Sequence, residues 1–88
     1  MRQRADWMTG ADDAILEFLA KTDAAFSKRG LEVNFEQKDI GVSYSTLKRR
    51  LPILEEHGLV EEVETEGAWY QITDNGRAYL AGELDAST

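Results

Sequence analysis

The chain has 88 residues, no cysteine and no apolar run near the ~18 residues of a membrane span. These features predict one small cytoplasmic unit and exclude disulfides, thiolate metal sites and a catalytic cleft between two lobes. Seventeen acidic residues against ten basic ones give a formal charge of −7, whereas proteins that bind nucleic acid usually present a basic face. An acidic, lysine-poor composition is typical of proteins from a high-salt cytoplasm, so we expect a halophilic origin.

The first 22 residues predict a short arm and a helix. Residues 1–8 form a polar arm whose last two side chains, Trp7 and Met8, are expected to dock on the domain. Thr9 followed three residues later by Asp12 resembles a capping box and predicts a helix over roughly 10–22. Its expected inward positions are Ala11, Ile15, Phe18 and Leu19, with Leu16 at the margin.

The next segment carries weaker signals. Residues 23–30 are predicted as a loop or as a frayed continuation of the first helix. Residues 31–33 are apolar at alternate positions and could add a third strand to a later hairpin. Asn34 followed by Gln37 is an N-cap signal that predicts a short second helix at about 35–40, burying Phe35 and Ile40.

Residues 43–57 predict a third helix with two different faces. Ser43 is the expected cap, and Pro52 lies inside the helix, where we expect a kink because the apolar stripe continues in phase beyond it. That stripe consists of Leu47, Leu51 and Leu54. Polar and basic side chains stand opposite it, at about 100° per residue.

A hairpin and a last helix complete the chain. Two β-like runs within 59–73 bracket the turn-forming string E-T-E-G. Trp69 and Tyr70 must face opposite sides of this hairpin, so one is core and the other is either core or an exposed partner contact. Thr73 caps a helix predicted over 74–84, with Ala78 and Tyr79 inward and Leu80 as a further candidate.

This order of elements predicts an α+β, mostly α fold: a single winged helix-turn-helix domain over 1–88.

A Lys-Arg-Arg run is more often a solvated helix face, but its position between a capped turn and a hairpin favours DNA contact. Arg49 is the best candidate for bidentate recognition of guanine O6 and N7, and Lys48 is expected on phosphate. The predicted DNA-binding residues are Ser43, Tyr44, Ser45, Thr46, Lys48, Arg49 and Arg50. Arg2 and Arg4 could enter a minor groove, although a disordered basic tail is the commoner situation.

Three strings carry a family resemblance: R-Q-R-A-D-W-M-T, Y-S-T-L-K-R-R-L-P-I-L-E-E-H-G-L-V-E and Y-Q-I-T-D-N-G-R-A-Y-L-A-G-E-L. The chain resembles small winged-helix regulators of haloarchaea, similar to the phage phi-H repressor family and more distantly to the MarR, ArsR and PadR groups. The resemblance implies sequence-specific binding of duplex DNA, often as a homodimer, with the third helix in the major groove. The candidate dimer residues are Trp7, Met8, Tyr79, Leu80 and Leu84.

Two segments depart from that pattern. Residues 31–41 are more polar than the second helix usual in such proteins. The wing tip, Glu64-Thr65-Glu66-Gly67, carries no cation, so a wing that normally touches phosphate would here repel it. We therefore keep an alternative open, in which the same fold is a protein-interaction module without DNA.

Other functions have little support. The string Ser45-Thr46-Leu47-Lys48 matches the S-x-x-K of serine acyl enzymes, but their companion strings are missing. His57 beside two glutamates is better explained as a side chain at a helix C-terminus than as a metal ligand. We expect no enzyme, no metal and no cofactor. The sequence does not indicate an effector ligand, an operator, or whether transcription is repressed or activated, although repression by promoter occupancy is the expectation.

Overall fold

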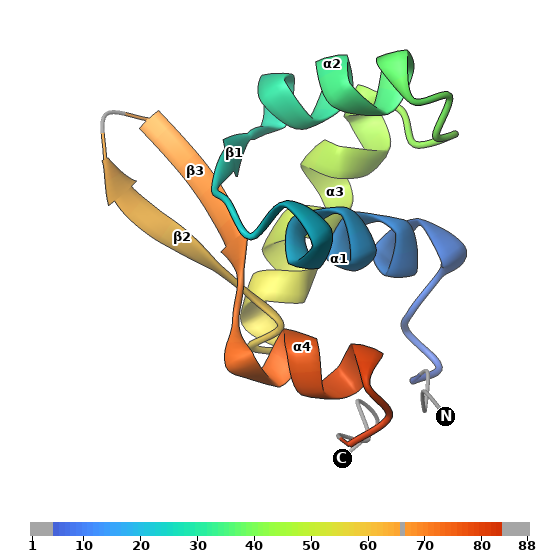
Figure 1. Ribbon diagram of the computed structural model, residues 1–88, viewed down its shortest axis with the longest axis vertical. Coiled ribbons are helices and arrows are strands. Elements are labelled where there is room, and N and C mark those ends of the chain that lie inside the picture. Colours follow the sequence, from blue (N-terminus) through green and yellow to red (C-terminus); the bar gives the residue numbers. More distant parts are fainter. Residues whose placement is uncertain (1–4, 66, 84–88) are drawn as a thin grey trace.

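The computed structural model describes residues 5–65 and 67–83, with only the backbone described at 64 and 65. Four helices surround one side of a small antiparallel sheet (Figure 1). In chain order the elements are α1 (Gly10–Thr22), β1 (Phe26–Ser27), α2 (Lys28–Gln37), α3 (Tyr44–Glu56), β2 (Val60–Thr65), β3 (Gly67–Ile72) and α4 (Asp74–Leu80). Within the described residues, no helix has the length and apolar character needed to cross a membrane.

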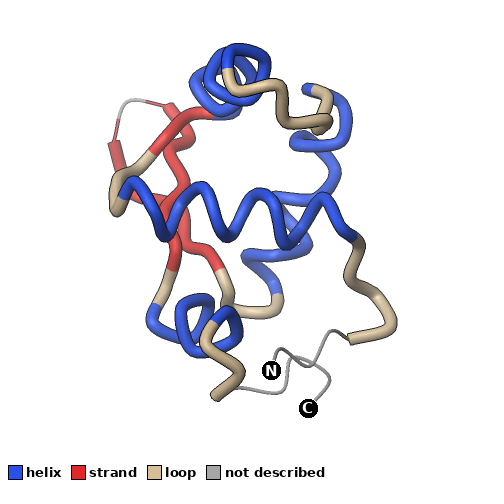
Figure 2. Tube along the Cα trace, turned by 45° about the vertical axis from the view of Figure 1, so that its right-hand side comes forward, coloured by secondary structure: helices blue, strands red, loops and turns tan. Residues whose placement is uncertain are grey.

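Helix α1 confirms the prediction for residues 10–22. The backbone N–H of Thr9 donates to the Asp12 carboxylate at 2.9 Å, as the capping box requires. The helix runs through the middle of the molecule (Figure 2), and this position explains an error in the predicted face. Leu16 is fully buried rather than marginal, and Asp12 is fully buried as well.

The region between α1 and α3 was predicted wrongly. The third strand is Phe26–Ser27, not residues 31–33, and α2 begins at Lys28 rather than near residue 35. Ser27 is the N-cap, since its hydroxyl accepts from the backbone N–H of Gly30 at 3.0 Å. Asn34 lies inside the helix and donates its side-chain amide to the Gly30 carbonyl at 2.7 Å. The predicted burial of Phe35 is confirmed, because Leu31 and Phe35 form the inward face of α2.

Helix α3 follows α2 after a short turn, as the sequence predicts. Its cap is Ser43, and its three leucines are completely buried. The helix continues through Pro52, whose ring is exposed, to Glu56. An uninterrupted α2–turn–α3 unit followed by a hairpin is the arrangement of a winged helix-turn-helix.

The wing is the hairpin of β2 and β3, and the sheet order is β1-β3-β2. Val63 pairs with Trp69, and Glu62 pairs with Tyr70. Successive residues of a strand face opposite sides. Tyr70 therefore lies in the core, at 5% exposure, while Trp69 is 40% exposed.

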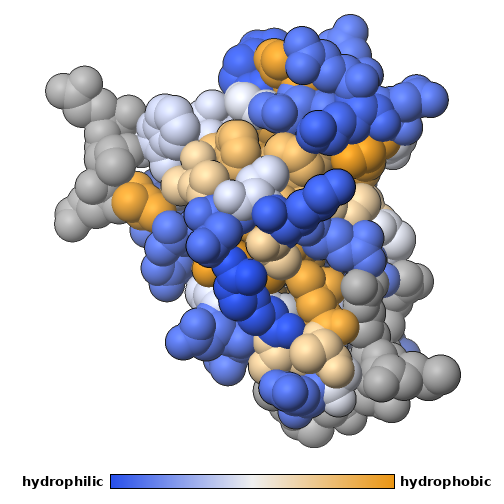
Figure 3. Space-filling model, viewed as in Figure 1, coloured by the Kyte–Doolittle hydropathy of each residue, from blue (hydrophilic) through white to orange (hydrophobic). Residues whose placement is uncertain are grey.

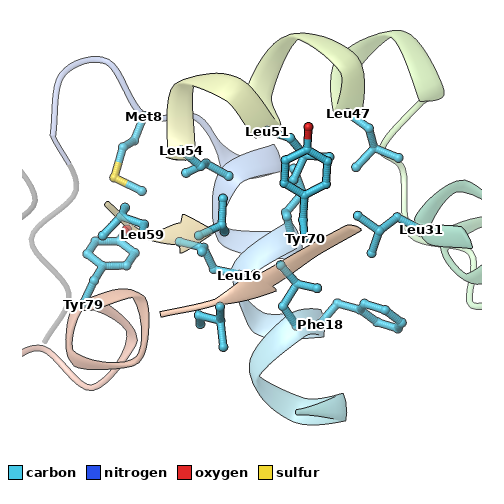
Figure 4. Packing of buried hydrophobic residues seen from close by; sticks show 14 of the residues in the cluster. Met8, Leu16, Phe18, Leu31, Leu47, Leu51, Leu54, Leu59, Tyr70 and Tyr79 are labelled. Carbon is cyan, nitrogen blue, oxygen red and sulfur yellow. The ribbon is translucent and has the colours of Figure 1, made fainter. Parts of the chain in front are cut away.

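The core joins all four helices to the sheet (Figure 4). Helix α4 packs tightly, since a Cβ at Gly76 would lie 2.3 Å from the Leu59 carbonyl oxygen. Tyr79 is fully buried, and its hydroxyl donates to Asp13 of α1 at 2.6 Å. Arg77 of α4 also pairs with Asp23 at the end of α1. These contacts join α4 to both ends of α1.

Candidate nucleic-acid interface

The outward face of α3 is polar and basic. Ser45, Lys48 and Arg49 are exposed, at the i, i+3 and i+4 spacing that places side chains on one side of a helix. Among the described residues, neither Lys48 nor Arg49 has an ion-pair or hydrogen-bond partner. The same face becomes acidic at its far end, where Glu55 and Glu56 are exposed. The cations are therefore concentrated in the first half of the helix.

Two hydroxyls organise the start of α3. The Ser43 side chain accepts from the backbone N–H of Thr46 at 3.2 Å, and the two hydroxyl oxygens lie 3.0 Å apart. Ser43 is exposed and Thr46 is half-buried. The cap holds the first turn in place while leaving the Ser43 hydroxyl at the surface.

Arg29 is a neighbour that the sequence reasoning missed. Its guanidinium carbon lies 4.9 Å from the centre of the Tyr44 ring, a cation–π distance, and Nη1 donates to Glu32 at 2.6 Å. Tyr44 is half-buried beneath it. A cation from α2 thus lies at the start of α3. Ser27 at the N-cap, with apolar Leu31 and Phe35 in helical spacing after it, is the signal that could have revealed this helix.

Arg50 does not belong to the outward face. Its Nε donates to Asp12 Oδ1 at 2.8 Å, and Nη2 donates to Asp12 Oδ2 at 2.7 Å and to the Trp7 carbonyl at 2.8 Å. The side chains of Arg50 and Asp12 are 15% and 0% exposed, and the hydrogen bond to Asp12 raises the pKa of Arg50 against the opposing effect of burial. Arg50 joins α3 to α1 and to the N-terminal segment. We assign Arg50 to this structural contact rather than to the interface, because its Nε and Nη2 donors are directed into the molecule.

The end of the N-terminal arm, residues 5–8, docks on the domain, as predicted for Trp7 and Met8. Ala5 and Met8 are buried, and the Trp7 ring stacks on His57 with centroids 3.9 Å apart and planes 9° from parallel. His57 is the C-cap residue of α3, and its ring packs on the Trp7 ring at that end of the helix. Within the described part of the chain, no group of three or more side chains is placed to hold a metal ion.

Two of the five predicted dimer residues belong to the core. Met8 and Tyr79 are buried, so neither offers a surface to a second copy. Trp7 and Leu80 are partly exposed but pack against the core cluster. Leu84, Arg2 and Arg4 lie outside the described residues.

The wing presents a surface unlike that of α3. Glu61 and Glu62 on β2 and Trp69 on β3 are exposed, and Glu61 accepts from the Gln71 side-chain amide at 2.6 Å. The opposite face of the wing lies against the core and carries Tyr70. Burial raises the pKa of the Tyr70 hydroxyl, and the negative charges of Glu62 and Glu55 raise this pKa further. The side chains of Glu64 and Glu66 at the tip lie outside the described residues.

Comparison with known proteins places this arrangement in a family. A family model described as a winged helix-turn-helix phage repressor matches residues 1–88. The chain belongs to the winged helix-turn-helix phage repressor family. It is 33% identical to the repressor protein of Halobacterium phage phiH over 85 residues, which is 96% of this chain and 91% of the relative.

A solved structure supports the same assignment within this family. The crystal structure of the PhiH1 repressor-like protein from Haloarcula marismortui is 40% identical and superposes with a TM-score of 0.82. The similarity covers 98% of this chain and 91% of that one. The fold predicted from the sequence, an α+β winged helix, is thereby confirmed.

Proposed function

We propose that this chain is a sequence-specific regulator that binds duplex DNA and represses transcription by occupying a promoter. The observation that carries the proposal is the pair of exposed cations Lys48 and Arg49 in the first half of α3, opposite a fully buried leucine stripe. Neither cation has a partner within residues 5–65 and 67–83. Membership of a phage repressor family supports it. The proposed regulator contains no catalytic machinery and requires no cofactor.

The mechanism places the outward face of α3 in the major groove. Arg49 has the planar, two-pronged donor set that fits guanine O6 and N7, and Ser45 beside it can bond to either base or phosphate. Lys48 and the exposed Ser43 hydroxyl are assigned to phosphate. Arg29, stacked on Tyr44, adds a cation from α2 at the same end of the helix. The overall charge of −7 does not prevent this binding, since local charge distribution decides which face meets DNA.

The wing has a minor role in this mechanism. Its sequence carries acids at 61, 62, 64 and 66 and no cation, so close approach to phosphate is unfavourable. We assign the affinity to α3 with Arg29, and any further electrostatic contribution to the basic residues of the arm, Arg2 and Arg4. In a cytoplasm of high salt, the gain from counterion release falls, and base contacts supply a larger share of binding.

We further propose that two copies bind together. A single small recognition helix offers few base contacts, and a two-fold dimer can read two half-sites about one helical turn apart, ~34–36 Å. Met8 and Tyr79 are buried, so of the predicted dimer residues only Trp7, Leu80 and Leu84 remain as candidates for the contact between copies. Sedimentation at tens of micromolar protein in molar potassium chloride tests the dimer, and a purely monomeric profile with and without DNA would contradict it.

A second candidate function is a protein-interaction module. The observation that favours it is Trp69, a large apolar side chain 40% exposed on an acidic wing. In that case the fold would present the wing rather than α3 to its partner. The two candidates predict different responses to DNA and are separated by the experiment below.

The test is a fluorescence-anisotropy titration with the DNA upstream of the chain's own gene and with a scrambled duplex of equal length. We expect tighter binding to the promoter duplex and a loss of that preference in Arg49→Ala. Lys21→Ala is the matched control, because Lys21 is an exposed cation on α1 rather than on α3. Equal affinity for both duplexes, or no binding, would overturn the DNA-reading function and leave the interaction module.

A further inference from the structure

A groove lies between α1 and the turn that leads into the recognition helix. It encloses about 410 Å³ and is lined by Ala14, Glu17, Phe18, Lys21, Thr22, Lys38 and Ile40. Volumes of roughly 300–1,000 Å³ are typical of small-molecule sites. Figure 3 shows apolar atoms along the boundary between α2, at the top, and α1 below it. None of the lining residues belongs to the outward face of α3.

The floor of the groove is apolar and fixed by the core. The Phe18 ring makes edge contact with Phe35 and a tilted contact with Phe26, each with ring centroids 5.1 Å apart. Ala14 and Ile40 are half-buried beside it. The backbone N–H of Ile40 donates to the Phe35 carbonyl at 2.8 Å, which holds the turn over the groove. The groove is therefore present before any ligand arrives.

The rim of the groove carries two cations. Lys21 and Lys38 are exposed, and they are two of only four lysines in a chain whose formal charge is −7. Glu17 is the one carboxylate among the lining residues, so the rim has a formal charge of +1. An apolar floor with a positive rim complements a molecule that has an apolar ring or chain and one negative group.

We infer that this groove binds a small amphipathic organic acid, whose apolar body lies on Phe18, Ala14 and Ile40 and whose carboxylate lies between Lys21 and Lys38. A second consequence concerns regulation and rests on the proposed function. The ligand would contact both α1 and the residues 38–40 that precede α3, so its binding would favour one orientation of the recognition helix. By thermodynamic linkage, if the ligand changes the affinity of the protein for DNA by some factor, DNA changes the affinity of the protein for the ligand by the same factor.

The binding test uses 2-naphthoate as the probe and the neutral 2-naphthamide as its matched control. Amide resonances of Lys21, Thr22, Lys38 and Ile40 are followed by two-dimensional NMR during titration. We expect saturation by naphthoate with a Kd below about 1 mM, and binding of the naphthamide at least about tenfold weaker. Equal binding of the two probes, or shifts centred on the exposed Val33 and Trp69 instead, would overturn the site.

Variants locate the two halves of the site. The double substitution Lys21→Gln with Lys38→Gln should weaken naphthoate binding about tenfold and leave the weak naphthamide binding unchanged. Lys28→Gln, a lysine outside the groove, should change neither. Ala14→Phe should fill the groove and prevent binding of both probes, with circular dichroism reporting the fold. If Ala14→Phe does not fold, the double lysine variant still tests the site, because both of its positions are exposed. Unchanged naphthoate affinity in that double variant would overturn the site.

The regulatory consequence has a separate readout. The affinity for promoter DNA is measured with and without saturating naphthoate, and we expect it to change by about fivefold or more. Unchanged DNA affinity with demonstrated naphthoate binding would overturn the coupling alone. Failure of the chain to bind DNA at all would overturn the proposed function together with the coupling, and would leave the binding result standing.

Discussion

The two faces of α3 differ although they share one basic run. On the outward face, Lys48 and Arg49 are exposed and have no partner among the described residues. On the inward face, the next residue, Arg50, makes two hydrogen bonds to the buried Asp12 and one to the Trp7 carbonyl. Each residue of an α-helix turns the side chain by about 100°. Adjacent arginines can therefore have unrelated roles, one in binding and the other in stability.

This contrast also explains how an acidic protein can present a basic surface on one face of a helix. Of three consecutive cations, one is neutralised inside the molecule and two remain outside. The exposed acids of α3 lie at its other end, at Glu55 and Glu56. The sum of charges is a poor guide to this helix, because the arrangement along and around it decides what its surface can bind.

The largest expected effect comes from breaking the inward pair. Asp12→Ala should lower the free energy of unfolding by about 3–5 kcal/mol, because it leaves the largely buried Arg50 side chain without its carboxylate partner and also removes the capping-box hydrogen bond to Thr9. Denaturant unfolding at fixed potassium chloride measures this loss. The double variant Asp12→Leu with Arg50→Met, which removes both charges, should recover much of the stability. A loss below about 0.5 kcal/mol in the single variant, the size usual for surface sites, would show that the pair is not structural.

The next largest effect comes from the outward arginine. Arg49→Ala should cost about 1–3 kcal/mol of binding to the promoter duplex, since it removes a bidentate base contact. Its unfolding free energy should stay within about 0.5 kcal/mol of the parent. Anisotropy and denaturant unfolding of the same preparation check both statements. A variant that loses stability but keeps its preference for the promoter would reverse the roles assigned to the two arginines.

Lys48→Ala should have a smaller and less selective effect. A phosphate contact carries no sequence information, so affinity should fall alike for promoter and scrambled DNA. The slope of log affinity against log salt should decrease by about one. Titrations at several potassium chloride concentrations measure the slope. An unchanged slope with a selective loss for the promoter would assign Lys48 to a base instead.

The smallest effect is expected on the wing. Replacing both Glu64 and Glu66 with Gln should change DNA affinity by less than about tenfold, ~1.4 kcal/mol, through charge alone. Anisotropy with both duplexes measures the change. A loss of promoter binding greater than this would mean that the acidic tip makes a direct contact, and that the affinity does not come from α3 alone.

The parts of the fold that were predicted correctly have strong local signals. Helix α1 has its capping box, α3 has a capped start and an unbroken leucine stripe, and the hairpin has two β-like runs around a turn. Helix α2 has weaker local signals. Its N-cap residue, Ser27, is also the last residue of a strand of two residues, and the helix contains Gly30 and Asn34, which are poor helix formers. Packing of Leu31 and Phe35 on the core overrides these propensities.

The exposed residues of the outward face of α3 and of the predicted dimer surface were harder to predict from the sequence, because the burial of a side chain depends on segments that are distant in the chain. The partners of Arg50 are 38 and 43 residues away, and the partner of Tyr79 is 66 residues away. Helical periodicity places a side chain on a face, but it does not show which other helix covers that face. Arg50 was therefore assigned to the outward face, although its side chain contacts α1. The predicted docking of Met8 and inward position of Tyr79 are confirmed, and their burial argues against their second assignment to a dimer surface. Arg29 was missed for the same reason, since its place beside Tyr44 depends on how α2 packs.

The most direct test of the account compares the two arginine side chains within one complex. The Nε–H resonances of Arg49 and Arg50 are assigned by NMR and followed as the promoter duplex is added. We predict that the Arg49 signal shifts or sharpens on binding, together with the backbone amides of Ser45 and Lys48. The Arg50 signal, held by Asp12, should stay in place. A shift of the Arg50 signal with Arg49 unchanged, or shifts confined to the wing, would contradict the assignment of DNA reading to the outward face of α3.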